Sequence, residues 1–317
     1  MKIGLDTMGG DFAPENEVLG AIEAFSLLKN DSRIVLFGDK TRIEEVCEKV
    51  GFDPANFEIV HTTEIIGMHD NPAKAFVQKP DSSMAMGFRA LASRQIDGFA
   101  SPGNTGAMMV GVMYTVKPIE GIARPCISST YPLVNGKTGL LLDVGLNADC
   151  KPENLYQNAM LGALYAKWAM GLENPRVGLM NIGEEAAKGN LLVKAAYDLM
   201  KDSKDFTFAG NIEGYDFMTG KKADVVVCDG FVGNIILKLA ESFYRIAGSL
   251  GIDKEFFNRL NYETYGGTPV LGVNAPVIIG HGGSSPKAIK NMVLLTENVI
   301  NAQLVKRVKD ALSENNY

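Results

Sequence analysis

Short runs of almost wholly apolar residues recur along this chain, and stretches with helical periodicity separate them. The clearest are LLLD at 140–143 and DVVVC at 224–228, which do not alternate between apolar and polar residues. Such strands are typical of a parallel sheet that helices cover on both faces. The pattern therefore predicts an α/β protein of three layers, α/β/α, around a largely parallel, mixed sheet.

The alternation of strand-like and helical stretches continues along the whole chain. Strands are expected at 3–5, 34–37, 98–101, 139–143, 177–180, 207–209, 224–228 and 276–279. Helices are expected at 17–28, 41–50, 154–169 and 286–312. No low-complexity linker or internal repeat divides these elements, so we predict a single catalytic domain over residues 1–317.

Five of the expected strands are followed by turns that combine glycine with Asn, Ser, Asp, Lys or His. The turns are SPGNTG at 101–106, VGLNAD at 144–149, IGEE with KGN between 182 and 190, DGFVGN at 229–234, and HGGSS at 281–285. Because ligands bind outside the carboxyl ends of parallel strands, we expect these loops to converge. Glycine lets backbone N–H groups approach an anion closely, and a helix N-terminus adds partial positive charge. The loops therefore predict a phosphate site.

A few side chains in these loops have chemistry that suits such a site. Lys188 precedes Gly-Asn at an expected helix start, where a cation opposes the helix dipole and needs a compensating anion. Asn104 and Asn234 supply amide donors that hold an oxyanion or a carbonyl without titrating, and His281 falls inside a glycine-rich loop. The alternative for each position taken alone is an ordinary turn or a surface residue.

Charge and missing motifs exclude several classes of protein. The formal net charge of −6 argues against nucleic-acid binding, which requires a basic face. GHGGSS at 280–285 approaches the GxGxxG fingerprint, but no acidic residue follows at the ribose-binding distance, so a dinucleotide is not expected. Neither a GxSxG elbow nor a Cys–His pair supports a covalent acyl-enzyme. Scattered cysteines and the lack of a secretory signal or apolar span favour a cytoplasmic protein.

Seven motifs, in order along the chain, resemble the PlsX family, the bacterial phosphate acyltransferases of phospholipid synthesis. They are MGGD at 8–11, S-x-GNTGA at 101–107, LLDVGxNxD at 141–149, GLxNIGEE with KGN at 178–190, GNIE at 210–213, DGFVGNxxLK at 229–238, and YGGxPxLG with HGxS between 265 and 284. The resemblance implies an isocitrate/isopropylmalate dehydrogenase-like fold and a homodimer. It also implies formation of acyl phosphate from acyl-ACP and inorganic phosphate, without metal or cofactor.

The resemblance and the loops together define the expected site. Phosphate itself attacks the thioester, so no nucleophilic side chain is needed. Catalytic roles are expected for Lys188, Asn234, His281 and Asp229: the first two steady phosphate or the oxyanion, and His281 protonates the leaving thiolate. Contacts with phosphate or substrate are expected for Gly9, Gly10, Asp11, Ser101, Gly103, Asn104, Thr105, Gly106, Asn147, Asn190, Gly282 and Ser284.

The implied partners are acyl carrier protein as donor and a membrane glycerol-3-phosphate acyltransferase that takes the product. The helical excursion at 238–263 is shorter than PlsX proteins generally carry, and its apolar residues favour a dimer contact over a peripheral membrane contact. Met108, Met109 and Met113 are candidates to line an acyl channel, with burial in the core as the alternative.

Two other functions stay open from the sequence. One is a phosphotransacetylase-like enzyme that uses acyl-CoA, although the usual Ser-Arg pair of that family is absent from the last glycine-rich loop. The other is a catalytically idle protein that binds phosphate or acyl groups.

Overall fold

The computed structural model describes residues 1–29 and 31–314. The chain forms two compact units, of which unit 1 comprises Met1–Pro118 with Tyr262–Asn301, and unit 2 comprises Ile119–Asn261 with Ala302–Tyr317. Each unit thus combines segments that lie far apart in the sequence. That the whole chain works as one catalytic domain stays a prediction.

Unit 1 contains six strands of mostly parallel sheet. In spatial order they are β3 (Glu58–His61), β2 (Arg33–Gly38), β1 (Lys2–Asp6), β4 (Gly98–Ser101), β11 (Val277–Ile279) and β10 (Thr268–Leu271). Only β10 runs antiparallel to its neighbour within this unit. Leu5 pairs with Ala100, and Ser101 pairs with Ile279, so the carboxyl ends of β1, β4 and β11 lie side by side.

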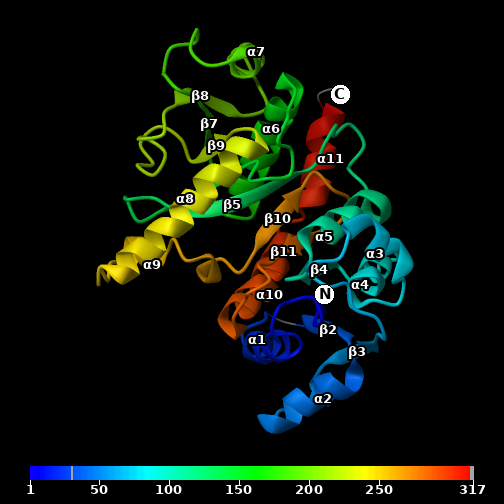
Figure 1. Ribbon diagram of the computed structural model, residues 1–317. Helices are drawn as coiled ribbons and strands as arrows, with labels where there is room; N and C mark the ends of the chain where they lie inside the picture. The colour runs from blue at the N-terminus through cyan, green and yellow to red at the C-terminus, as the bar shows by residue number, and fades with distance from the viewer. Residues whose placement is uncertain (30, 315–317) are drawn as a thin grey trace. The chain divides into compact units, whose positions relative to one another are not determined.

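Helices cover both faces of this sheet. They are α1 (Glu15–Phe25), α2 (Lys40–Lys49), α3 (Pro72–Gln78), α4 (Ser83–Ala92), α5 (Thr105–Gly111), which continues into the π-helical turn η2 (Val112–Val116), and α10 (Pro286–Asn301). The space beside Gly98 is filled by Ile300 of α10, whereas Phe99 packs on Phe88 of α4. Successive strand residues point to opposite faces, so α10 and α4 lie on opposite sides. Helix α1 packs beside α10 (Figure 1).

Unit 2 contains five strands in the order β5 (Cys126–Pro132), β6 (Thr138–Leu142), β9 (Val225–Val227), β7 (Arg176–Met180) and β8 (Thr207–Ile212). All pairs are parallel except β5 with β6. The helices are α6 (Pro152–Trp168), α7 (Leu191–Met200), α8 (Gly230–Ser249), the short α9 (Glu255–Asn258) and α11 (Leu304–Glu314). As expected from its apolar circumference, α6 is largely buried, and it packs on β9, α7 and α11 (Figure 1).

The last expected helix differs from the prediction. The apolar pattern of 286–312 predicts one helix, but α10 ends at Asn301 and α11 begins at Leu304. Gln303 lies between them with a φ of +50°, in the left-handed region that ends a helix. Both helices bury an apolar face, so the periodic pattern runs through the break. No helix in the described part of the chain is long and apolar enough to cross a bilayer.

Candidate active site

Three loops meet at the carboxyl edge of the unit 1 sheet. They follow β1, β4 and β11 and comprise residues 7–11, 102–104 and 280–285. The amide of Gly280 donates to the carbonyl of Ser101 at 2.8 Å, and the amide of Asp11 donates to the carbonyl of Gly282 at 2.9 Å. The loop after β11 is therefore hydrogen-bonded to the loop after β1 and to the last residue of β4.

A buried carboxyl fixes the first two loops to each other. Asp6, the last residue of β1, is fully buried and accepts hydrogen bonds from Ser101 Oγ at 2.7 Å and from the amide of Met8 at 3.0 Å. Ser101 Oγ in turn accepts from the amide of Gly103 at 3.0 Å. Burial raises the pKa of Asp6, and hydrogen bonds from Ser83, Ser101 and Met8 oppose this shift. Ser101 thus serves the loop itself.

The backbones of the first two loops also touch directly. A Cβ on Gly9 would lie 2.8 Å from the Cα of Gly103, and a Cβ on Gly103 would lie 3.1 Å from the Cα of Gly9. Only glycine fits at such an approach of two backbones. Gly9 of MGGD and Gly103 of SPGNTG are therefore explained by close packing of the two turns.

Many backbone N–H groups of these loops and the helix starts behind them are unused. Within the described residues, the amides without an acceptor belong to Gly9, Gly10, Asn104, Thr105, Gly106, His281, Gly282, Ser285 and Lys287. Buried backbone donors are almost always paired, so a cluster of unpaired ones faces water or a ligand. Together with the N-terminus of the 16-residue helix α10, these amides can bind an anion without any basic side chain.

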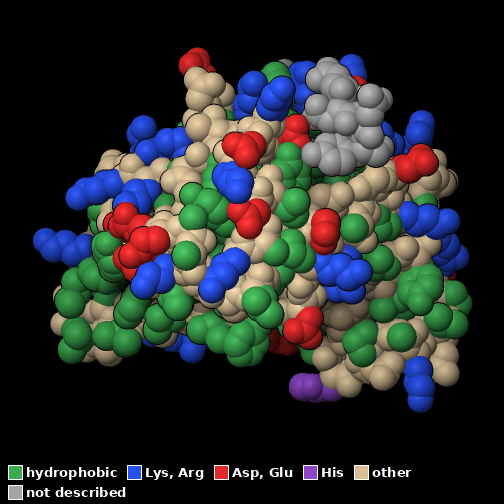
Figure 2. Space-filling view, turned by 90° about the horizontal axis from the view of Figure 1, so that it is seen from above, with side chains coloured by type: hydrophobic (Ala, Val, Ile, Leu, Met, Phe, Trp, Pro, Cys, Tyr) green, Lys and Arg blue, Asp and Glu red, His purple; other side chains and the backbone are tan. Residues whose placement is uncertain are grey.

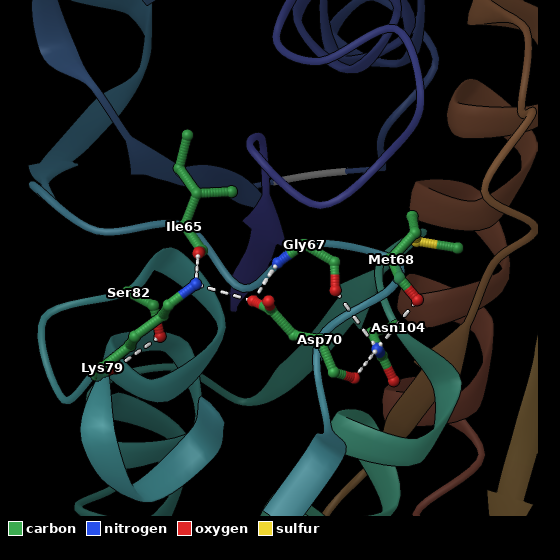
Figure 3. Close-up of polar contacts among 7 residues, drawn as sticks. All are labelled: Ile65, Gly67, Met68, Asp70, Lys79, Ser82 and Asn104. Atoms are coloured by element: carbon green, nitrogen blue, oxygen red, sulfur yellow. Dashed lines mark hydrogen bonds and ion pairs between the residues drawn. The ribbon is translucent and has the colours of Figure 1, made fainter. Parts of the chain in front are cut away.

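Asn104 clamps a further segment against this edge (Figure 3). Its Nδ2 donates to the carbonyl oxygens of Gly67, Met68 and Asp70, each at 3.2 Å, and its Oδ1 accepts from the amide of Ala107 at 3.1 Å. Asn104 is buried, and its carboxamide is taken up by protein groups. It caps α5 and holds the segment 67–70, which is a different role from the free amide donor expected from sequence.

A lysine holds the other side of the same segment (Figure 3). Lys79 Nζ donates to the carbonyl of Ile65 at 2.7 Å and to Asp70 Oδ2 at 2.6 Å, and Ser82 Oγ donates to the Lys79 carbonyl at 2.8 Å. The hydrogen bond from Lys79 is the main cause that lowers the pKa of Asp70. A Cβ on Gly282 would lie 2.7 Å from Met68 Cε, so this segment adjoins the site. Nothing in the motifs indicated it, because it contains no glycine-rich strand end.

His281 presents one ring nitrogen to solvent. Its Nδ1 accepts from the amide of Gly283 at 3.3 Å, and its ring stacks on Tyr262 with centroids 4.7 Å apart. The neutral ring therefore carries its proton on Nε2, which has no partner among the described residues. Ser284 is buried, and its Oγ donates to the carbonyl of His281 at 2.6 Å. Ser284 shapes the loop, whereas His281 is exposed and available.

A second cluster lies at the carboxyl edge of the unit 2 sheet. Asp143, directly after β6, is fully buried and accepts from the amides of Gly145, Leu146 and Asn147 at 3.2, 3.1 and 2.8 Å. Asn147 Nδ2 donates to Asp143 Oδ2 and to the carbonyl of Pro125, both at 2.8 Å. Both hydrogens of the Asn147 carboxamide are thus engaged by the protein.

The helix after β9 packs onto this cluster. Asp229 caps α8 by accepting from the amide of Val232 at 2.9 Å, and the amide of Gly230 donates to the carbonyl of Asn147 at 2.8 Å. Asn234, one turn further on, is exposed and lies beside Gly145, where a Cβ would stand 3.4 Å from Asn234 Oδ1. Its carboxamide makes no hydrogen bond within the part of the chain that the structure describes.

The loop after β7 carries the expected lysine. Asn190 caps α7 by accepting from the amide of Val193 at 2.9 Å. Lys188 is exposed, and among the described residues no carboxylate lies within ion-pair distance of it. Its neighbour Glu184 pairs instead with Lys222. The Lys188 ammonium is therefore available to an anion.

Glu17 is a titratable group at the unit 1 edge that sequence reasoning missed. It lies in the first turn of α1, where its side chain is buried and fills the space beside Gly10. Its Oε2 has no hydrogen-bond partner among the described residues. Burial raises its pKa to about 8; its own backbone N–H opposes the shift, and the charges of Asp6 and Asp11 add to it. Its position in an ordinary amphipathic helix offered no signal.

The expected residues thus fall into two groups. Unit 1 brings together Gly9, Gly10, Asp11, Ser101, Gly103, Asn104, Thr105, Gly106, His281, Gly282 and Ser284. Unit 2 brings Asn147, Asp229 and Asn234 together around Asp143. Lys188 and Asn190 lie in the loop after β7, the strand that pairs with β9.

Known proteins resemble this chain along its whole length. Residues 1–307 match the model of a family described as "Fatty acid synthesis protein". A phosphate acyltransferase from Dictyoglomus turgidum is 39% identical over 333 aligned residues, which cover 99% of this chain and 98% of that protein.

Solved structures resemble the fold. A phosphotransacetylase from Streptococcus pyogenes has a TM-score of 0.66 at 19% identity, covering 96% of this chain and 94% of that one. A 4-hydroxythreonine-4-phosphate dehydrogenase from Klebsiella pneumoniae has a TM-score of 0.55 at 13% identity, covering 95% and 98%. The predicted α/β class with a mixed, largely parallel sheet and helices on both sides is confirmed.

Proposed function

The chain belongs to the fatty acid synthesis protein family and is a phosphate acyltransferase, and from this premise we propose how its loops use their substrates. The donor is acyl-ACP, the acceptor is inorganic phosphate, and the product is an acyl phosphate that feeds phospholipid synthesis. A phosphate oxygen attacks the thioester carbonyl carbon, the C–S bond breaks, and the carrier thiolate leaves and takes up a proton.

One observation carries the assignment of the phosphate site. Unpaired backbone amides follow three adjacent parallel strands, β1, β4 and β11, at one edge of the unit 1 sheet. Inorganic phosphate presents several acceptor oxygens and no apolar surface, so a cradle of amides suits it. The loops 101–106 and 281–285 are the proposed cradle, with Gly9, Gly10 and Asp11 beside them.

The proposed proton donor is His281. Its Nε2–H has no protein partner, while Tyr262 and Gly283 hold the ring in place. In its imidazolium form the same ring can donate the Nε2 proton to the departing thiolate, and the proton lost by the attacking hydrogen phosphate restores the charge on the ring. Because each ring contact fixes orientation and leaves Nε2 exposed, substitution of His281 is expected to affect turnover more than folding.

Lys188 and Asn234 are proposed to steady phosphate or the developing oxyanion. Both are exposed and make no side-chain hydrogen bond or ion pair within the described residues, so both donors are available. A preorganised oxyanion donor contributes about 3 to 4 kcal/mol to catalysis, and orienting two bound reactants contributes roughly 7 to 11 kcal/mol. Positioning therefore outweighs any single proton transfer in this mechanism.

Replacing Lys188 tests its role. We expect Lys188→Ala to lower kcat by about 100-fold, the usual effect of removing a donor at a developing charge, and to leave the thermal midpoint unchanged. Lys194→Ala is the matched control, because Lys194 is also exposed and lies one turn into α7. Turnover of Lys188→Ala that equals that of Lys194→Ala would contradict the proposed role.

The reaction itself is tested by trapping its product. Purified protein is incubated with phosphate and either acyl-ACP or acyl-CoA, and hydroxylamine converts any acyl phosphate into a hydroxamate. We expect hydroxamate with acyl-ACP and phosphate together and none when either is omitted. A preference for short acyl-CoA would favour a phosphotransacetylase-like enzyme, and no product from either donor would favour an idle binding protein.

Further assignments stay predictions of the sequence and the family likeness. They are a homodimer, delivery of product to a membrane glycerol-3-phosphate acyltransferase, and a cytoplasmic location with peripheral contact to the membrane.

A further inference from the structure

An apolar groove of about 490 Å³ lies in unit 1 beside the proposed phosphate cradle. Its walls come from α3 and from α5 with η2, and its base includes Ala85 of α4. The residues that define it are Ala73, Phe76, Val77, Pro80, Val110 and Tyr114. Among the lining residues only Arg89 carries a charge. This volume falls within the usual range for small-molecule sites.

The groove begins within one turn of the phosphate cradle. A Cβ on Gly106 would lie 2.5 Å from Pro72 Cγ, so the first turns of α3 and α5 are packed together. Asn71 caps α3 and Asn104 caps α5 at this same end. Ala73 lines the groove one residue beyond Pro72, and Val110 and Tyr114 line it successively farther from Asn104. The groove therefore leads away from the loop at 101–104.

The groove is built on a rigid base, yet its walls are open. The Phe76 ring packs edge-on against Phe88 with centroids 5.9 Å apart, and Phe88 packs on Phe99 of β4 at 5.1 Å. By contrast, Val77 is 75% exposed and Tyr114 is 76% exposed. A row of exposed apolar side chains on a fixed base suits an apolar occupant that is absent from the free protein.

We propose that this groove binds the acyl chain of the donor and so sets the preference for chain length. The proposal rests on the proposed function, which requires a long apolar chain to extend from a thioester at the cradle. Val110, Tyr114 and Thr115 of α5 and η2 form one wall and Ala73, Phe76 and Val77 of α3 form the other, so an acyl chain that enters beside Gly106 would lie between the two helices. The aliphatic stem of Arg89 continues the apolar lining while its guanidinium stays in water.

The assignment replaces the channel expected from sequence. Met108 is fully buried in the core, and neither Met109 nor Met113 lines the groove. The side chains that do line it, Val110 and Tyr114, belong to the same helical stretch but to another face of it. Each methylene buried in such a groove strengthens binding by about fourfold, from the free energy of burying one CH₂.

Two variants test the groove. Val110→Trp fills it, and Val77→Glu places a carboxylate on its exposed wall, where misfolding is not expected. Val50→Trp and Val50→Glu are matched controls, because Val50 is an exposed valine at the end of α2, outside the groove. We expect wild-type kcat/KM to rise with the length of the acyl-ACP chain. Both groove variants should lose at least tenfold with long chains and little with short ones, whereas the controls match wild type.

A binding measurement separates this proposal from the proposed function. Titration with the fluorescent fatty acid cis-parinaric acid should show at least tenfold weaker binding to Val110→Trp than to Val50→Trp. This readout needs no turnover, so it decides on the groove even if no donor yields acyl phosphate. Unchanged chain-length preference and unchanged probe binding in both groove variants would overturn the proposal. It would equally be overturned if the variants changed only the sedimentation of the protein, because the groove would then contact a second copy.

Discussion

Two asparagines that look alike in the sequence have different surroundings in the fold. Asn104 and Asn234 each follow a glycine soon after a strand, and both were expected to hold substrate. The carboxamide of Asn104 caps α5 and donates to three carbonyl oxygens of residues 67–70. Asn234 is exposed with its carboxamide unpaired in the described chain. At the scale of the residue, a side chain is available for chemistry only where the fold leaves its polar atoms unused.

Alanine at these two positions should therefore give opposite results. We expect Asn104→Ala to lower the free energy of unfolding by about 1 to 3 kcal/mol, since a helix cap and hydrogen bonds to buried groups are lost. Asn234→Ala should leave stability unchanged and lower kcat. Chemical denaturation and the hydroxamate assay measure the two effects. Equal free energies of unfolding for the two variants would show that the hydrogen bonds of Asn104 do not stabilise the fold.

Glu17 makes stability depend on pH in an unusual direction. The folded protein keeps its proton up to the raised pKa of about 8, whereas the unfolded chain releases it near the ordinary value of 4.5. Between these values the folded state binds more protons, so this residue's contribution to stability falls as pH rises from about 4.5 to about 8. A carboxyl whose pKa is lowered by folding has the opposite effect, because its contribution to stability rises with pH.

Glu17→Gln removes the titrating group while keeping its shape. We expect the variant to gain stability relative to wild type as pH rises from about 5 to about 8, because only the wild type must suppress ionisation of a buried carboxyl. Urea denaturation across this range measures the difference. A difference that stays constant with pH would contradict the assignment.

At the scale of the element, α8 is placed by its first turn. Asp229 caps it, and the space beside Gly233 is taken by the carbonyl oxygen of Asp143. That carbonyl cannot move aside easily, because five hydrogen bonds of up to 3.2 Å hold the Asp143 side chain. The glycines of DGFVGN therefore serve helix packing, and the motif's free donor is Asn234.

Two glycines of α8 allow a matched test. A Cβ on Gly233 would overlap the Asp143 carbonyl oxygen, whereas a Cβ on Gly248 would meet nothing within 4 Å. We expect Gly248→Ala to stabilise the protein by about 0.5 to 1 kcal/mol through helix propensity. Gly233→Ala should destabilise it by more than this gain, because its backbone neighbour must shift. Thermal unfolding of both variants checks the prediction, which is wrong if both alanines stabilise.

At the scale of the whole molecule, α8 leaves one face without a partner in the described chain. Its exposed apolar side chains follow helical spacing and include Phe231, Ile235, Leu239, Phe243, Ile246 and Leu250. Hydrophobic side chains gather at the lower left of Figure 2, on the side where Figure 1 draws α8 and α9. A continuous apolar stripe of this kind marks an interface, and a second copy of the chain is the predicted partner.

An acidic residue in this stripe should separate the predicted dimer. Leu239 and Leu27 are each 54% exposed, but only Leu239 lies in the stripe. We expect Leu239→Asp to sediment as a monomer at concentrations where wild type and Leu27→Asp sediment as dimers, because a carboxylate would be buried against apolar residues. If all three proteins are dimers, the stripe is not the contact, and vesicle binding by the same variants would then test a membrane contact.

The sequence alone determined the α/β class, the strand ends that carry glycine-rich loops, and the family. These properties are local, because apolar runs, turn residues and ordered motifs can be recognised without knowing any distant neighbour. The strands β3, β5 and β10 and the break between α10 and α11 escaped prediction, since each depends on what packs against it.

Only the tertiary structure decided which polar groups remain available. Asn104 is bound by carbonyls more than 30 positions earlier, Asp6 meets Ser101 across 95 positions, and the Gly282 carbonyl accepts from the amide of Asp11. The apolar groove likewise requires α3 and α5 to lie together. Availability, burial and cavity shape arise from contacts between distant segments, and a linear pattern contains no record of which distant segments meet.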